Sequence, residues 1–155
     1  MNQNFSQLIS EAIQLELNVG KLYLLFQNLL PEDSVFWWEL AIEEENHAAL
    51  LKTAELMDAS HLEIPSEIMP SGVADLKEAN QAILKAMEDF KREPDRTTAF
   101  QLALKIELSA GESHYNDFMT TAPGSRIAEI LRRLNRDDQD HARRIREYMA
   151  VHHIS

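Results

Sequence analysis

The sequence has no cysteine, few glycines and prolines, and far fewer basic than acidic residues. Without cysteine, the 155 residues can form no disulfide, thiolate metal site, cysteine-ligated iron–sulfur centre or thiol nucleophile. Only 4 glycines and 5 prolines are present, which disfavours a sandwich or barrel with many tight turns. The 15 basic and 26 acidic residues leave a net charge of −11, which argues against nucleic-acid phosphates and anionic membranes as partners.

Long apolar segments are missing as well. No apolar run approaches the roughly 18 residues of a membrane span. The opening residues 1–4 are polar and do not have the pattern of a signal peptide. We therefore expect a soluble, cytoplasmic protein. No low-complexity tract or composition break divides the chain, so residues 1–155 are predicted to form a single domain.

Apolar residues recur at helical spacing along most of the chain, which predicts an all-α protein. Prolines and glycines mark the breaks, and helices are expected over residues 5–29, 32–57, 73–91, 95–119 and 125–148. Short connections join the first helix to the second and the fourth to the fifth, so each pair should be antiparallel. The long connection over 58–94 then crosses the bundle and carries the third helix. This layout predicts a four-helix bundle with a long crossover that contains an extra helix.

Each of the four long predicted helices carries one acid within its apolar stripe. These acids are Glu16, Glu44, Glu107 and Asp138. An unpaired buried carboxylate costs several kcal/mol or becomes protonated, and four carboxylates together would repel one another strongly. A pair of divalent cations is the simplest group that would reverse this cost.

Histidines follow two of these acids at a spacing suited to metal binding. Glu44-x-x-His47 and Asp138-x-x-His141 each place an acid and an imidazole on one helix face, where both can bind the same metal. A third match, Asp58-x-x-His61, falls in a predicted loop and is interpreted as chance. The other two lie in the middle of helices, one in each half of a weak two-fold repeat of helix pairs.

Four neighbouring acids receive simpler interpretations. Asp137 and Asp140 have arginines at helical offsets and are expected to belong to solvent-exposed charge networks. Glu43 and Glu45 are expected to flank the metal site, and a contact with one of the ligands stays open for both.

At these residues the sequence resembles the ferritin-like di-iron carboxylate superfamily, and most closely the helical domain of the rubrerythrin family. The shared pattern is a lone glutamate from each of two helices and an acid-x-x-His pair from each of the other two. The resemblance extends over nearly the whole chain and implies a ferritin-like bundle that holds two iron ions, with manganese or zinc as other occupants. The implied metal ligands are Glu16, Glu44, His47, Glu107, Asp138 and His141.

The resemblance also implies how these side chains would share the metals. Glu44 and Asp138 would bridge them, the other two acids would each bind one metal, and so would each histidine. Tyr23 and Tyr115 match positions where rubrerythrins place tyrosines near the metals. Each of the two is interpreted either as a hydrogen-bond donor beside the ligands or as an ordinary core aromatic.

Three departures from the rubrerythrin pattern affect the expected chemistry. Ala110 stands where a further glutamate is usual, so a seventh carboxylate is missing, and His114 is interpreted either as a replacement ligand or as a core histidine. Asp138 is one methylene shorter than the usual glutamate, which can alter the bridging or the metal spacing. The cysteine-ligated rubredoxin domain is absent, so electrons would come from an external, rubredoxin-like donor.

The first functional hypothesis is a di-iron oxidoreductase that reduces hydrogen peroxide or O₂, a peroxidase or a ferroxidase. The second is an iron-binding or iron-storage module, and the third is a metal-free helical interaction protein whose buried acids are protonated. Oxygenation of an organic substrate by activated O₂ would need a pocket that a sequence does not reveal. A homodimer or a higher homo-oligomer is expected.

Overall fold

The computed structural model describes residues 3–58, 69–110 and 126–155, and within these ranges the protein is all-helical, with no strand. The predicted all-α class is thus confirmed for the described residues. Five α-helices and one short 3-10 helix follow in the order α1 Gln3–Leu29, η1 Pro31–Asp33, α2 Ser34–Asp58, α3 Met69–Arg92, α4 Arg96–Ala110 and α6 Arg126–Val151.

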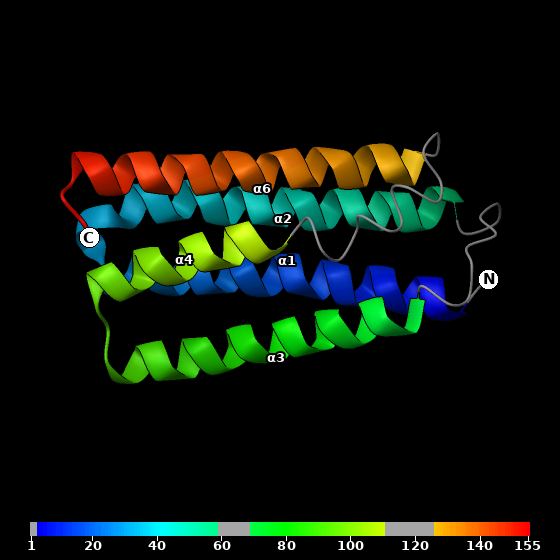
Figure 1. The fold of residues 1–155 in the computed structure, drawn as a ribbon, viewed down its shortest axis with the longest axis horizontal. Coiled ribbons are helices and arrows are strands. Elements are labelled where there is room, and N and C mark those ends of the chain that lie inside the picture. Colours follow the sequence, from blue (N-terminus) through cyan, green and yellow to red (C-terminus); the bar gives the residue numbers. More distant parts are fainter. Residues whose placement is uncertain (1–2, 59–68, 111–125) are drawn as a thin grey trace.

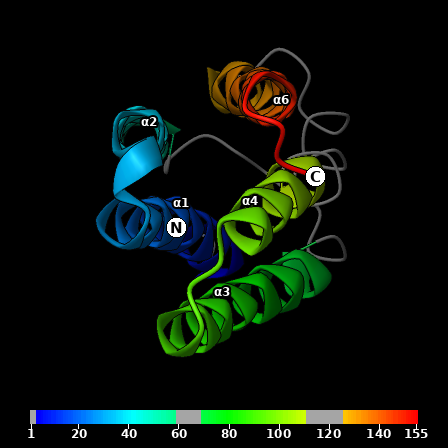
Figure 2. The same ribbon diagram turned by 90° about the vertical axis from the view of Figure 1, so that its left-hand side faces the viewer.

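The axes of the helices lie roughly along one common line, the long axis of the molecule (Figure 1). Helices α1 and α2 run in opposite directions, and so do α4 and α6. Helix α1 packs against α2 and α3, while α6 packs against α2 and α4. Seen end-on, α1, α2, α6 and α4 surround a common centre, and α3 lies beside α1 and α4 on the side away from α6 (Figure 2). The side chains predicted to bind metal come from the four helices around this centre.

The helix boundaries differ from the sequence-based expectation at the start of α3. Residues 58–72 are predicted as a loop, but α3 begins at Met69 and includes Pro70 and Gly72 in its first turn. Proline is tolerated there because its missing N–H has no partner in the first turn of a helix. The rest of this predicted loop, residues 59–68, and the end of the fourth predicted helix, residues 111–119, lie outside the described residues.

The short connection from α3 to α4 follows the predicted break. Asp95 stands directly before α4, and its Oδ2 accepts hydrogen bonds from the Thr98 backbone N–H and from the Thr98 hydroxyl, both at 2.7 Å. This capping satisfies an N–H group that has no partner within the helix. The break at Pro94 therefore both ends α3 and begins α4.

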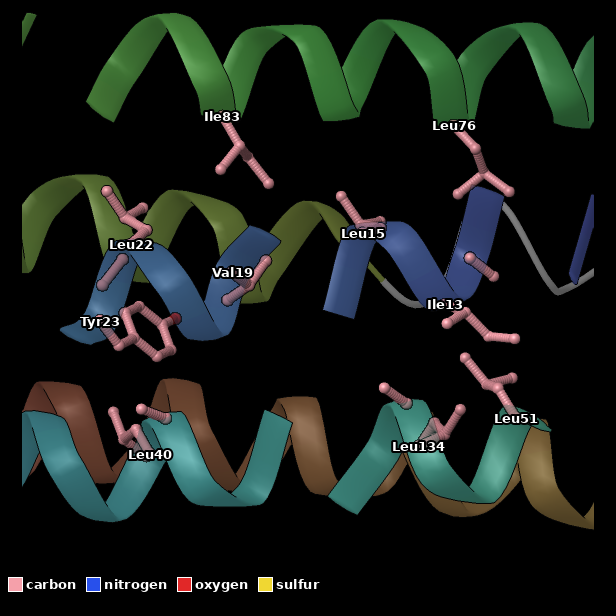
Figure 3. Packing of buried hydrophobic residues seen from close by; sticks show 14 of the residues in the cluster. Ile13, Leu15, Val19, Leu22, Tyr23, Leu40, Leu51, Leu76, Ile83 and Leu134 are labelled. Carbon is pink, nitrogen blue, oxygen red and sulfur yellow. The ribbon is translucent and has the colours of Figure 1, made fainter. Parts of the chain in front are cut away.

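One apolar core joins the helices, with α1 in the middle. Leu76 and Ile83 of α3 point toward α1 from one side, and Leu40 and Leu51 of α2 point toward it from the other (Figure 3). The largest fully buried side chains include Trp37, a residue of α2. Burial of this apolar surface is the main force that holds the helices in register around the polar centre.

A polar network also holds α3 on α1. The Asn80 amide donates to the backbone oxygen and to Oε2 of Glu11, both at 3.1 Å, and Asn18 donates to Oδ1 of Asn80 at 2.9 Å. Both asparagines are buried, so these bonds satisfy amide groups that water cannot reach.

None of the described helices combines the length and the apolar character that crossing a bilayer requires.

Candidate metal centre

The structure brings the six predicted ligands together in the interior. Glu16 lies on α1, Glu44 and His47 lie on α2, Glu107 lies on α4, and Asp138 and His141 lie on α6. All six are buried, and none exposes more than 5% of its surface. Their ligand atoms form two groups, each with atoms within 4.8 Å of one another. The first group is Glu16, Glu44, His47 and Asp138, and the second is Glu44, Glu107 and His141.

The first group surrounds Nδ1 of His47. This nitrogen lies 3.3 Å from Oε2 of Glu44, 3.4 Å from Oε2 of Glu16 and 4.0 Å from Oδ1 of Asp138. Three helices therefore direct oxygen atoms toward one imidazole nitrogen. A cation placed among these atoms would receive four ligands from the chain.

The second group surrounds Nδ1 of His141. That nitrogen lies 3.0 Å from Oε1 of Glu44 and 3.4 Å from Oε1 of Glu107. The approach to Glu44 lacks hydrogen-bond geometry, so Nδ1 of His141 and Oε1 of Glu44 are both buried without a hydrogen-bond partner among the described residues. Two orphaned polar atoms that face each other in the interior need an explanation, and a shared cation would satisfy both.

Glu44 belongs to both groups and Asp138 to the first alone. The two histidine rings are nearly parallel, with centroids 5.5 Å apart and an interplanar angle of 22°. Glu44 lies where it can bind on both sides, as the resemblance implies for a bridging acid. Asp138, which the resemblance implies as a second bridging acid, lies in one group only, and its side chain is one methylene shorter than that of glutamate.

Close packing of α1 and α2 helps to position Glu44. A side chain at Gly20 would place its Cβ 3.4 Å from Cβ of Glu44 and 3.5 Å from the backbone oxygen of Ala41. These are ordinary van der Waals distances, so α1 and α2 lie close together beside the acid common to both groups.

Two further acids contact the outer nitrogens of the histidines. Oε2 of Glu43 lies 2.7 Å from Nε2 of His141, and Oδ2 of Asp137 lies 3.3 Å from Nε2 of His47. Each acid directly precedes a candidate ligand on its own helix and contacts the histidine of the opposite helix. A carboxylate on Nε2 fixes the ring orientation and the tautomer, so that Nδ1 faces the centre as a ligand atom.

These outer contacts correct the prediction for Asp137 and show which ligand Glu43 contacts. Asp137 is 39% exposed at its side chain and lies 3.8 Å from Arg133, but it does not belong to a surface network alone, because it also reaches His47. Asp140 pairs with Arg143, as predicted for an exposed charge network. Glu43, whose contact was left open, binds His141 and accepts hydrogen bonds from Arg144 at 2.8 and 2.9 Å. The repeated order acid, acid, x, x, histidine at 43–47 and 137–141 was the sequence signal for both contacts.

Tyr23 is fully buried, and its hydroxyl donates a hydrogen bond to Oε1 of Glu107. The tyrosine therefore contacts a candidate ligand, which favours the interpretation as a hydrogen-bond donor beside the ligands. Tyr115 and His114 lie outside the described residues, as does the side chain of Ala110.

Burial and mutual repulsion control the charges of the four acids. Burial raises the pKa of Glu16 to about 8, and burial together with nearby carboxylates raises the pKa of Glu107 and of Asp138. Burial disfavours the ionised form of Glu44 as well, but its contacts with His141 and His47 outweigh this effect and hold the pKa of Glu44 well below its usual range.

For the two histidines, as for Glu44, contacts with charged partners outweigh the effect of burial on the pKa. Burial disfavours a charged imidazole, but the surrounding carboxylates outweigh it and raise the pKa of His47 to about 11 and that of His141 to about 12. Without another cation, two imidazolium groups therefore supply the positive charge of the centre. A metal ion would replace their protons, because only a neutral imidazole can bind a metal.

The chain matches no protein-family model, no curated protein and no solved structure in the comparisons made. The properties of the centre therefore follow from its own side chains. Buried carboxylate and imidazole groups lie close enough to hold a metal ion, and within the described residues the ion-pair partners of the four acids are the two histidines. The donor set contains oxygen and imidazole nitrogen and no thiolate, which suits iron, manganese or zinc.

Proposed function

We propose that the protein is a rubrerythrin-like di-iron oxidoreductase that reduces hydrogen peroxide or O₂ with electrons from an external donor. The observation that carries this proposal is the pair of buried ligand groups that share Glu44. One group would hold one metal and the other group a second metal, with Glu44 between them. In this proposal α1, α2, α4 and α6 form a ferritin-like four-helix bundle, and α3 belongs to its long crossover.

The composition of the centre supports a redox-active metal. Four carboxylates and two imidazoles favour iron or manganese, and Fe(II) is the one of these that reacts readily with O₂ as well as with peroxide. Two Fe(II) ions bound side by side would supply the two electrons that convert hydrogen peroxide to two water molecules.

The side chains around the ligands have supporting tasks in this proposal. Glu43 and Asp137 hold the two imidazoles with Nδ1 directed inward, and Arg144 in turn anchors Glu43. Tyr23 donates a hydrogen bond to Glu107 and so restricts the orientation of this carboxylate. The geometry of the ligands would thus be set before any metal enters, which lowers the cost of ordering them on binding.

An iron-storage module is the second candidate, and the acidic composition supports it. The net charge of −11 would attract Fe(II) from solution. Both candidates need the same centre and differ in the oxidant, because storage requires rapid oxidation of Fe(II) by O₂.

Stopped-flow mixing of the anaerobic Fe(II)-loaded protein with H₂O₂ or with O₂ separates these functions. We expect ferric absorbance in the near ultraviolet to develop faster with peroxide. Faster oxidation by O₂ would favour storage or ferroxidase activity, and no oxidation above that of free Fe(II) would overturn the proposal. Glu44→Gln should lose the reaction, whereas Glu45→Gln, which changes the exposed neighbouring acid, should retain it.

A further inference from the structure

A continuous set of aromatic side chains leads from the candidate metal centre to one end of the molecule. Tyr23, which contacts Glu107, has its ring centroid 5.5 Å from that of Trp37. Trp37 in turn contacts three phenylalanines, with centroid distances of 4.9 Å to Phe26, 5.2 Å to Phe36 and 4.5 Å to Phe100. The aromatic contacts thus extend without a break from α1 through α2 to α4.

The same contacts continue to the surface. The ring of Tyr148 on α6 stacks on Phe36 at 4.2 Å and on Phe100 at 5.4 Å, so two parallel links join it to Trp37. Tyr148 is partly exposed, and the exposed ring of His152 stacks on it at 4.0 Å. The end of α6 lies at the same end of the molecule as the starts of α2 and α4 (Figure 1).

Hydrophobic packing explains why Trp37 and the phenylalanines are buried. It does not explain why a buried acid lies at the hydroxyl of Tyr148. The Tyr148 hydroxyl donates to Oδ1 of Asp33 at 2.9 Å, and Asp33 is only 1% exposed. Arg96 donates two hydrogen bonds of 2.7 and 2.9 Å to the Asp33 carboxylate and fixes its position. A proton acceptor is therefore fixed in place for Tyr148.

We propose that Tyr23, Trp37 and Tyr148 form an electron-transfer path between the metal centre and the surface at the end of α6. Tyrosine and tryptophan are the side chains here that lose single electrons most readily, and Phe36 and Phe100 fill the gap between them. The path rests on the proposed function, because only an oxidising centre would draw electrons along it.

Hydrogen peroxide is the oxidant, and each electron has a defined source. Peroxide takes up two electrons and two protons and becomes two water molecules. Trp37 gives an electron inward past Tyr23 and keeps its proton, because its indole N–H has no hydrogen-bond acceptor among the described residues. Tyr148 then reduces Trp37 and passes its phenolic proton to Asp33. A one-electron donor of the ascorbate class at the surface then reduces the Tyr148 radical, and the proton returns to Tyr148 from Asp33. Two such passes supply both electrons. The two protons that peroxide consumes come from solvent.

The protonation state of Tyr148 agrees with this sequence of events. Burial and the hydrogen bond to Asp33 raise the pKa of Tyr148 to about 12, so its phenol is protonated at neutral pH. Oxidation must therefore be coupled to loss of the proton, for which Asp33 is the bonded acceptor.

Flash photolysis of the metal-free protein tests the path without any contribution from the metal. The background variant is Trp38→Phe, which removes the exposed tryptophan and leaves the fully buried Trp37 as the only one in the chain. An ultraviolet laser flash ejects an electron from Trp37 and leaves its radical inside the protein. Transient absorbance then follows the decay of the Trp37 radical and the rise of a tyrosyl radical as Tyr148 reduces it.

We expect the Trp37 radical to decay quickly in the background variant as a tyrosyl radical appears, and this decay to slow on the further change Tyr148→Phe. A blank that also carries Trp37→Phe gives the absorbance without Trp37. Phe90→Leu is the matched control, because Phe90 contacts Phe26 but neither Trp37 nor Tyr148, and it should leave the decay unchanged. Equal decay of the Trp37 radical with and without Tyr148, or no tyrosyl radical in the background variant, would overturn the path. Because no metal is present, failure of this experiment is distinct from failure of the centre to bind iron.

Discussion

Two regions of the protein bury carboxylates, and they neutralise them by different means. Asp33, 1% exposed, receives two hydrogen bonds from the Arg96 guanidinium and one from Tyr148. Glu44, 2% exposed, has two histidines beside it and three further acids around them, and its Oε1 has no hydrogen-bond partner among the described residues.

The difference shows which of the two regions still lacks a cation. A permanent cation of the chain matches the charge of Asp33, so this end of the protein is complete as folded. The centre around Glu44 has more acids than cationic side chains, and it reaches balance only by raising pKa values and by protonating histidines. A metal ion held between these groups would both balance the excess of acids and satisfy the orphaned atoms.

Removal of Arg96 should have the largest effect on stability. Arg96→Met leaves the Asp33 carboxylate buried without its cation, and we expect the free energy of unfolding to fall by about 3 kcal/mol. Urea denaturation measures this loss, which should be the same with and without added metal. Arg143→Met, which breaks an exposed ion pair, is the control and should cost less than about 1 kcal/mol. An equally small loss for Arg96→Met would show that the two regions do not differ as described.

Metal binding should stabilise the centre and leave the Asp33 region unaffected. Mn²⁺ at a free concentration of about 100 times its dissociation constant should raise the free energy of unfolding by about 2.7 kcal/mol per site. Urea denaturation at increasing Mn²⁺ concentrations checks this value. Glu44→Gln should abolish the increase, whereas Arg96→Met should retain it. An increase that survives in Glu44→Gln would place the metal elsewhere.

Loss of an outer contact should weaken the centre without removing a ligand. Asp137→Asn deprives His47 of the carboxylate on Nε2, and we expect metal affinity to fall about 10- to 100-fold. Calorimetric titration with Mn²⁺ measures the change. Asp140→Asn serves as the control, since Asp140 pairs with Arg143 on the surface, and its affinity should equal that of the unmodified protein. Equal affinities for the two variants would contradict the role of Asp137.

The asparagine network between α1 and α3 should give the smallest effect. Asn80→Ala removes hydrogen bonds to Asn18 and Glu11, and we expect a loss of about 1 kcal/mol in the free energy of unfolding. Metal affinity should not change, because this network lies outside the centre. A large loss of metal binding in Asn80→Ala would show that α3 also supports the ligands.

The candidate ligands could be predicted from the sequence because each depends on a local pattern. Glu16, Glu44, Glu107 and Asp138 interrupt apolar stripes, and helical spacing alone places each on a buried face. The all-α class followed from the same periodicity. The prediction about Asp137 failed in part, because the arginines on its own helix explain its surface side and the contact with His47 comes from α2.

The Asp33 cluster could not be predicted for a related reason. Within its own segment Asp33 is an acid near the start of a helix, a position that usually stays in solvent. Its burial depends on Arg96 and Tyr148, which lie 63 and 115 residues further along the chain. Pairing over such separations is set by tertiary packing and has no local signal in one sequence.

Anaerobic titration of the metal-free protein with Fe(II) tests the central claim most directly, namely that the buried acids and histidines form a two-metal centre. We predict saturation at two irons per chain, one for each ligand group, and loss of this binding in Glu44→Gln. Binding of two irons that is unchanged in Glu44→Gln, or no stoichiometric binding at all, would contradict the account.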